Sequence, residues 1–66
     1  MKVNGKEVEI ATVTGKTIAE YLSSIKINLN TVAIEWNGEI LEREKWKETF
    51  LRDSDRIEII KFVGGG

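Results

Sequence analysis

The sequence predicts a small α+β domain whose elements follow the order β-β-α-β-β-β. Two Asn-Gly dipeptides, Asn4-Gly5 and Asn37-Gly38, lie between residues of alternating polarity, which is the strongest short-range signal for a β-hairpin. Between the two hairpins, apolar residues recur with helical spacing and predict one amphipathic helix. The length of 66 residues allows a single domain. The chain contains no Cys and no His, so we expect no disulfide and no zinc site.

The first hairpin has a register that its apolar residues support. A two-residue turn at Asn4-Gly5 pairs Val3 with Lys6 and Met1 with Val8. In this register every apolar residue falls on one face and the charged residues fall on the other. The apolar face then carries Met1, Val3, Val8 and Ile10, and the opposite face carries Lys2, Glu7 and Glu9.

A helix is predicted over residues 17–26. Thr17 and Glu20 have the spacing of a capping box, in which each side chain accepts a hydrogen bond from the other residue's backbone N–H. An apolar stripe follows at positions i, i+3, i+4 and i+7, formed by Ile18, Tyr21, Leu22 and Ile25. Lys26 would complement the helix dipole at the C-terminal end. So short a helix must pack on a sheet to persist.

The second hairpin and the last strand complete the sheet. Residues 32–36 alternate in polarity, Asn37-Gly38 turns, and residues 39–41 return. The charged segment 42–51 predicts a helical turn with Trp46 packed inward; a less favoured interpretation gives Arg43 or Lys45 a role in partner recognition. Residues 56–63 form the most apolar strand, which we expect at the centre of the sheet.

These elements predict a β-grasp fold, with a mixed sheet and one main helix packed on one face. The connection through the helix brings a later strand parallel to the first by a right-handed crossover. We assign residues 1–63 to this domain and residues 64–66 to a flexible glycine tail.

The other face of the sheet is expected to carry an exposed apolar cluster. Ile57 and Ile59 alternate toward the helix, so Ile60 and Phe62 should point to the open face. Ile40 and Ala33 join them there, and such clusters mark interaction sites. In the alternative interpretation, a twist or bulge near the end of the strand turns Phe62 back toward the core.

Composition excludes several classes of function. Without Cys or His, the chain has no nucleophilic triad and no thiol redox chemistry. A net charge of −1 provides no excess positive charge to bind nucleic acid or an anionic membrane. No apolar run approaches the roughly 18 residues that a membrane-spanning helix needs. We therefore expect a cytoplasmic protein that is not itself an enzyme and acts through a partner.

The most distinctive chemical feature is the ending Gly64-Gly65-Gly66. Glycine has no Cβ, so such a segment can thread a narrow channel and approach a nucleotide closely. Its α-carboxylate, with a reference pKa of about 3.5, is ionised at neutral pH and can attack a phosphate. A binding partner must supply the free energy that orders this segment, on the order of 1–2 kcal/mol per residue.

The chain resembles the ThiS family, the sulfur carriers of bacterial thiamine biosynthesis within the ubiquitin-like ThiS/MoaD superfamily. The resemblance rests on the hairpin Glu-Trp-Asn-Gly-Glu-Ile at 35–40, on Arg43 and Trp46, on the turn Asp-Ser-Asp-Arg at 53–56, and on the ending Ile-Glu-Ile-Ile-Lys-Phe-Val-Gly-Gly-Gly. It covers essentially the whole chain and is most specific over residues 35–66. Asp53-Ser54-Asp55 departs from relatives that have glycine in the middle of this turn.

The resemblance implies a reaction at Gly66. A ThiF-like adenylyltransferase would use ATP and Mg²⁺ to adenylate the Gly66 carboxylate, and a sulfur donor fed by a cysteine desulfurase would convert it to a thiocarboxylate. Thiazole synthase, ThiG-like, would receive the sulfur. The chain itself would bind no cofactor and no metal, and would be a monomer when free. Because an apolar cluster lies immediately before this reactive end, we expect partners to bind both. The expected partner-binding residues are Gly64, Gly65, Val63, Phe62, Ile60 and Ile40.

Two other functions stay open from the sequence. One is a sulfur carrier of the type of the molybdopterin-synthase small subunit, which shares the chemistry and differs in the acceptor. The other is a non-catalytic β-grasp interaction module whose terminal glycines have no chemical role.

Overall fold

The computed structural model describes residues 1–9, 11, 13 and 15–62. Its elements follow the predicted order β-β-α-β-β-β, together with two short 3₁₀ turns, of which the second confirms the helical turn predicted within residues 42–51. The strands are β1 (Lys2–Val3), β2 (Lys6–Glu7), β3 (Val32–Trp36), β4 (Glu39–Leu41) and β5 (Arg56–Lys61). The helix is α1 (Ile18–Ser24), and the 3₁₀ turns are η2 (Leu29–Thr31) and η3 (Arg43–Lys45).

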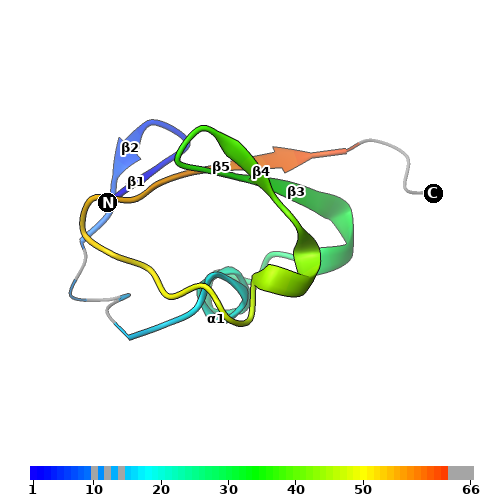
Figure 1. Cartoon of the computed structure of the whole chain (residues 1–66), viewed down its shortest axis with the longest axis horizontal. Helices are drawn as coiled ribbons and strands as arrows, with labels where there is room; N and C mark the ends of the chain where they lie inside the picture. The colour runs from blue at the N-terminus through cyan, green and yellow to red at the C-terminus, as the bar shows by residue number, and fades with distance from the viewer. Residues whose placement is uncertain (10, 12, 14, 63–66) are drawn as a thin grey trace.

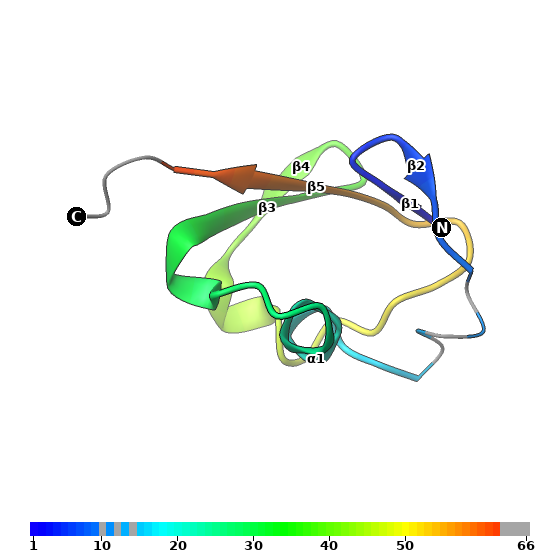
Figure 2. The ribbon, with the colours of Figure 1, turned by 180° about the vertical axis from the view of Figure 1, so that it is seen from behind.

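The five strands form one mixed sheet in the order β2-β1-β5-β3-β4. β5 lies in the middle, parallel to β1 and antiparallel to β3, as the sequence predicts. Figures 1 and 2 show the sheet as one layer, with α1 and the chain between β4 and β5 lying across one of its faces. The arrangement is the predicted β-grasp, with the other face of the sheet left open.

Both Asn-Gly turns adopt the conformation that the hairpins require. φ is +51° at Asn4 and +81° at Gly5, and +52° at Asn37 and +89° at Gly38. Positive φ at both central residues is the mark of the type I′ turn, whose twist matches that of the strands. The register is the predicted one, since Val3 pairs with Lys6 and Trp36 pairs with Glu39. The expected place of Ile10 lies outside the described residues.

The N-terminus of α1 has the predicted capping box. The Thr17 N–H donates to Oε1 of Glu20 at 2.9 Å, and the Glu20 N–H donates to Oγ1 of Thr17 at 3.2 Å. Two of the backbone donors that a helix leaves unpaired at its start are thereby satisfied.

The C-terminus of α1 differs from the prediction of residues 17–26, because the helix ends at Ser24. Lys26 takes a left-handed φ of +63°, its N–H donates to the Ser23 carbonyl at 3.0 Å, and the Ile27 N–H donates to the Leu22 carbonyl at 3.0 Å. This pair of bonds is the Schellman motif, here built around Lys instead of the usual Gly. Ile25, predicted to continue the buried stripe, is consequently 43% exposed.

The core lies between α1 and the covered face of the sheet. Trp46 is buried as predicted, and its indole Nε1–H donates to the Leu41 carbonyl at 2.9 Å. The buried apolar side chains are Met1, Val13, Ile18, Tyr21, Leu22, Val32, Ile34, Trp46, Leu51 and Ile57.

The predicted turn at residues 53–55 is present, but Asp55 does more than turn the chain. Its side chain is buried; Oδ2 accepts from the Arg52 N–H at 2.9 Å, and Oδ1 accepts from Nδ2 of Asn37 at 3.1 Å. Oδ1 of Asn37 in turn accepts from the Arg56 N–H at 2.9 Å. Asp55 therefore ties the β3–β4 turn to the start of the central strand.

Candidate functional site

The predicted reactive end of the chain follows the central strand. Val63, Gly64, Gly65 and Gly66 lie outside the described residues, so the structure fixes the strand that leads to them. β5 is described to Lys61, and one more pairing follows, because the Phe62 N–H donates to the Thr31 carbonyl at 3.1 Å. The strand predicted over residues 56–63 is thus confirmed over Arg56–Lys61; Phe62 follows the end of the strand, and Val63 lies outside the described residues.

An apolar patch formed by Ala33, Ile40, Ile60 and Phe62 lies at the end of the sheet where β5 finishes. Ala33 pairs with Ile60 across β3 and β5, and Ile40 pairs with Glu35 across β3 and β4. Directly paired residues share a face, and residues two apart on one strand do so too, so Ala33, Ile40 and Ile60 lie together on the open face.

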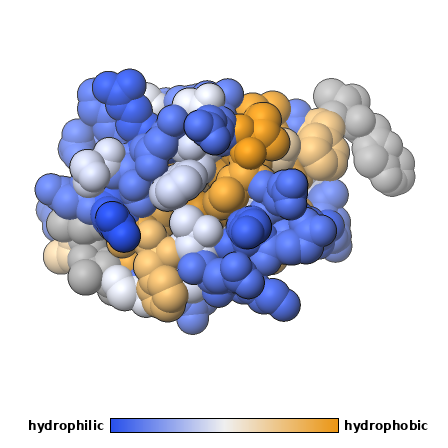
Figure 3. Space-filling view, viewed as in Figure 1, coloured by the Kyte–Doolittle hydropathy of each residue, from blue (hydrophilic) through white to orange (hydrophobic). Residues whose placement is uncertain are grey.

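The members of the patch are accessible. Ile40 is 64% exposed, Ile60 44% and Phe62 51%. Ala33, Ile40 and Phe62 line the same hollow of about 250 Å³. In Figure 3, hydrophobic surface gathers beside this end of the sheet among otherwise hydrophilic residues. Phe62 therefore belongs to the exposed patch, and the alternative in which it turns back into the core is wrong.

Charged side chains continue the open face away from the patch. The register pairs Glu35 with Glu58 and Lys2 with Arg56, so a pair of acidic residues and a pair of basic residues lie side by side. Like charges directly opposite each other destabilise the pairing of strands. The open face thus has an apolar end near Phe62 and a charged end near Lys2.

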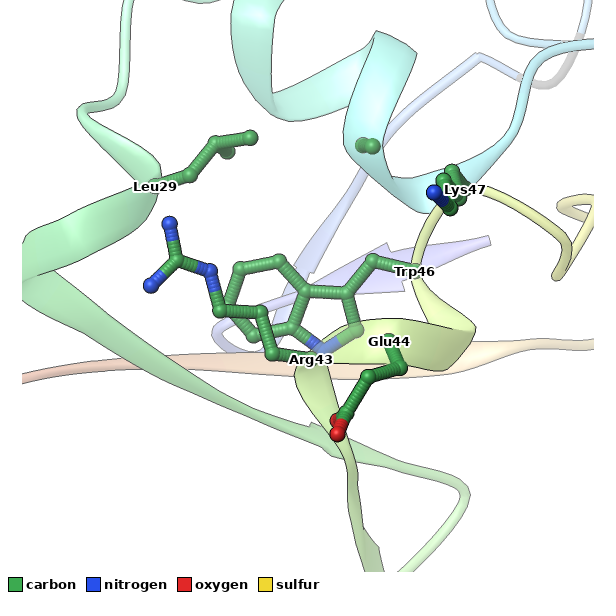
Figure 4. Close-up of a pocket in the computed structure, with 6 residues that line it drawn as sticks. Leu29, Arg43, Glu44, Trp46 and Lys47 are labelled. Atoms are coloured by element: carbon green, nitrogen blue, oxygen red, sulfur yellow. The ribbon is translucent and has the colours of Figure 1, made fainter.

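A second hollow, of about 470 Å³, lies on the helix side between α1, η2 and η3 (Figure 4). Ala19, Leu29 and Trp46 line it, and Arg43 extends across it toward Leu29. The Arg43 guanidinium donates to Oδ1 of Asn30, which ties η3 to η2. Arg43 thus has a structural contact, and a role for Arg43 or Lys45 in partner recognition stays a prediction.

A third hollow, of about 490 Å³, lies near the β3–β4 turn, and sequence reasoning missed it. Trp36 and the 58% exposed Phe50 line it together with Arg52 and Asp55. The indole Nε1 of Trp36 is buried without a hydrogen-bond partner. No short-range pattern joins Trp36 to Phe50, because the sheet and the isolated bridge from Thr17 to Phe50 bring them together.

The described residues offer few groups for chemistry of their own. Within residues 1–9, 11, 13 and 15–62, no three His, Cys, Asp or Glu side chains are grouped so as to hold a metal ion. In the same residues, no helix is long and apolar enough to span a membrane. Burial raises the pKa of the Tyr21 hydroxyl above its ordinary 10.0.

Curated relatives match the chain over nearly its whole length. The sulfur carrier protein ThiS of Bacillus subtilis (strain 168) is 42% identical over 66 residues, which is 100% of this chain and 98% of the relative. A thiazole synthase of Paramagnetospirillum magneticum (strain ATCC 700264 / AMB-1) is 30% identical over 64 residues. That alignment covers 97% of this chain but only 19% of the thiazole synthase.

Solved structures show the same fold. The crystal structure of a thiamine biosynthesis protein (ThiS) from Geobacter metallireducens superposes with a TM-score of 0.82 at 38% identity, over 98% of this chain and 96% of that one. A solution structure of a thiamine biosynthesis protein from Geobacter metallireducens gives a TM-score of 0.72 at 39% identity, over 98% and 85% of the two chains. The family model described as the ThiS family matches residues 1–66. Because the family model, a full-length relative and solved structures all match nearly the whole chain, the chain belongs to the ThiS family.

Proposed function

We propose that this protein is a sulfur carrier of thiamine biosynthesis that carries sulfur on its C-terminal residue, Gly66. The observation that supports this most is the full-length match to a sulfur carrier protein at 42% identity, in a chain that ends in three glycines. The protein would be a substrate that other enzymes modify and not an enzyme itself. We propose that it acts in the cytoplasm as a monomer.

The proposed chemistry takes place on the Gly66 carboxylate in successive steps. A carboxylate oxygen attacks the α-phosphate of ATP, pyrophosphate leaves, and an acyl adenylate forms. The terminal sulfur of a persulfide donor, charged by a cysteine desulfurase, then attacks the acyl carbon, AMP leaves, and an acyl disulfide forms. A thiol attacks the donor's sulfur, forms a disulfide with the donor, and releases the thiocarboxylate on Gly66. ATP and Mg²⁺ belong to the adenylyltransferase, so this chain needs no resident cofactor.

We assign the segment 63–65 to the channel of the partner and the apolar patch to its surface. Residues without a Cβ let the backbone approach a nucleotide, which is the physical use of Gly64 and Gly65. Ile60 and Phe62 are exposed immediately before residues 63–65 in the chain, and Ile40 is exposed on the same face of the sheet. A partner that covers these side chains can therefore also bind the C-terminal residues. Fixing these residues in a channel costs conformational entropy, and apolar contacts at the patch are a source of the free energy that offsets this cost.

We propose a thiazole synthase as the acceptor of the sulfur. Support comes from the thiazole synthase of Paramagnetospirillum magneticum, in which a segment resembling 97% of this chain is part of the same polypeptide. Two activities joined in one chain meet at a high effective concentration, which suits a carrier and the enzyme that it supplies.

Intact-mass spectrometry tests the proposed function. The protein is incubated with ATP, Mg²⁺, a ThiF-like adenylyltransferase, a persulfide-charged sulfur donor and a thiol reductant, and the product is fragmented. We expect exchange of one oxygen for sulfur, located at Gly66. A matched chain with one alanine added after Gly66 should stay unmodified, because its carboxylate lies one residue too far along.

The acceptor is tested separately with the sulfur-loaded protein. Formation of the thiazole by thiazole synthase supports the assignment, whereas sulfur transfer only to a molybdopterin precursor identifies the other class of carrier. Absence of sulfur at Gly66 despite an active adenylyltransferase overturns the carrier function and leaves an interaction module.

A further inference from the structure

The two Asn-Gly turns are chemically alike in sequence, yet their side chains are held differently. We propose that Asn4 is a site of spontaneous covalent modification, by deamidation and isomerisation to isoaspartate, and that its counterpart Asn37 is protected by the contacts of its side-chain amide. This inference does not depend on the sulfur-carrier function.

The reaction needs only the chain and water. The backbone nitrogen of Gly5 attacks Cγ of Asn4, a C–N bond forms, and the side-chain nitrogen leaves as ammonia, so that a five-membered succinimide remains. Water then opens the ring at one of its two carbonyls and gives aspartate or isoaspartate. Glycine favours the attack because no Cβ hinders its nitrogen.

Backbone geometry does not distinguish the two sites. Both asparagines have φ close to +51°, and both following glycines also have positive φ. A Cβ built on Gly5 or Gly38 meets no atom within 4 Å, so both glycines face open space. Any difference in reactivity between Asn4 and Asn37 must therefore come from their side chains.

The side-chain nitrogen of Asn37, the leaving group of the reaction, is held by a buried carboxylate. It donates to Oδ1 of Asp55 at 3.1 Å, while Oδ1 of Asn37 accepts from the Arg56 N–H at 2.9 Å. Asp55 is 4% exposed and is itself fixed by the Arg52 N–H. Rotating the Asn37 amide toward Gly38 breaks both of its hydrogen bonds. The buried Asp55 carboxylate then loses the hydrogen bond that Asn37 donates to it, which costs free energy.

Asn4 is held at one atom only. Its Oδ1 accepts from the Ile59 N–H at 2.7 Å, and among the described residues its side-chain nitrogen has no hydrogen-bond partner. Asn4 and Asn37 are both exposed, so exposure does not distinguish them, and the difference lies in these hydrogen bonds. The amide of Asn4 therefore rotates toward the Gly5 nitrogen at the cost of a single hydrogen bond.

Modification at Asn4 has a structural consequence. The Asn4 N–H donates to the Ile57 carbonyl at 2.8 Å, so Asn4 fastens the β1–β2 hairpin to the central strand through both its backbone and its side chain. Isoaspartate adds a methylene to the main chain of a two-residue turn and moves the oxygen that accepts from Ile59. We expect the isoaspartyl protein to melt at a lower temperature than the unmodified one.

The test compares the two turns within one molecule. The full folded chain is aged at mildly alkaline pH, and modification at each site is followed by peptide mapping and by methylation with an isoaspartyl methyltransferase. We expect Asn4 to react roughly tenfold faster than Asn37, the factor that corresponds to one additional hydrogen bond to a charged group. In denaturant the two rates should converge, because glycine follows each asparagine.

Three results overturn the proposal: equal rates in the folded protein, faster reaction at Asn37, or an Asn4 that stays intact while the denatured chain reacts. Modification to isoaspartate both adds a negative charge and lengthens the main chain. The Asn4→Asp variant separates these two effects, because it adds the charge without lengthening the main chain. The purified isoaspartyl product should melt below Asn4→Asp. Equal melting temperatures would show that the lengthened backbone has no effect.

Discussion

Tyr21 shows how burial of one side chain makes stability depend on pH. Burial raises the pKa of its hydroxyl above 10.0, because the phenolate is disfavoured away from water. The folded chain therefore binds this proton more tightly than the unfolded chain does. The resulting contribution to stability is complete below pH 10.0 and is lost as the pH rises through the higher pKa of the folded state.

We expect the free energy of unfolding to fall above pH 10.0, and the Tyr21→Phe variant to lose that part of the decline. Urea titrations of both proteins on either side of this pH measure it. Phe keeps the ring in the core and removes only the hydroxyl. An identical decline in both proteins would assign the effect to other groups.

Asp55 is a residue whose role the sequence could not reveal. Its spacing within Asp53-Ser54-Asp55 predicts a turn, which is present, but its partner Asn37 lies 18 residues away. A hydrogen bond over that distance depends on the packing of the β3–β4 turn against β5, and no local pattern records it. Thr17, by contrast, was recognisable as an N-cap from its spacing to Glu20 alone, and the structure confirms it.

The Asp55→Ala variant should lower the free energy of unfolding by about 1–3 kcal/mol, because it removes the acceptor of the Arg52 N–H and the Asn37 amide. Ser54→Ala, an exposed position in the same turn, is the control and should change little. Chemical denaturation measures both. A loss at Ser54 as large as at Asp55 would mean that the turn conformation matters, and not these hydrogen bonds.

Among the elements, the turns and the helix start were predictable, and the helix end was not. Asn-Gly and the Thr17–Glu20 pair act through neighbouring backbone atoms, so their signals lie within four residues. The end of α1 carries no such signal, since Lys26 occupies the left-handed position where Gly or Asn is usual. The burial of Ile27 beside the core explains why the chain leaves the helix there.

Thr17→Ala should destabilise the protein by about 1 kcal/mol, through loss of the side-chain acceptor at the start of α1. Ser23→Ala, on the exposed side of the same helix, should be neutral or slightly stabilising, because Ala has the higher helix propensity. Urea midpoints compare the two variants. Equal effects would contradict a specific role for the cap.

At the scale of the whole molecule, the sheet order and the open apolar patch followed from the sequence. A helix crossover and the apolar character of residues 57–63 place β5 beside β1 in the centre, and alternation places Ile60 on the open face. The hollow lined by Trp36 and Phe50 did not follow, because it forms where two segments distant in the sequence, residues 36–37 and 48–55, meet. The chemistry assigned to Gly66 came from family resemblance and stays a proposal.

Phe62→Glu should weaken binding to the adenylyltransferase by about tenfold or more, because an exposed aromatic side chain in an apolar patch is a typical binding hot spot. The fold should be little affected, since Phe62 is 51% exposed. Phe50→Glu is the matched control: Phe50 is 58% exposed and lies outside the patch. Titration calorimetry measures the affinities, and equal losses in both variants would remove the patch as the docking surface.

The central place of β5 also has a mechanical meaning. A partner that draws the last residues into its active site pulls along the axis of this strand, and β1 and β3 grip it from either side. Such a force acts on the hydrogen bonds of β5 with β1 and with β3 at the same time. An edge strand has hydrogen bonds on one side only, and the same force could break them one after another. The sheet thus resists tension best along the axis of β5, which is the direction in which a pull on the C-terminal residues would act.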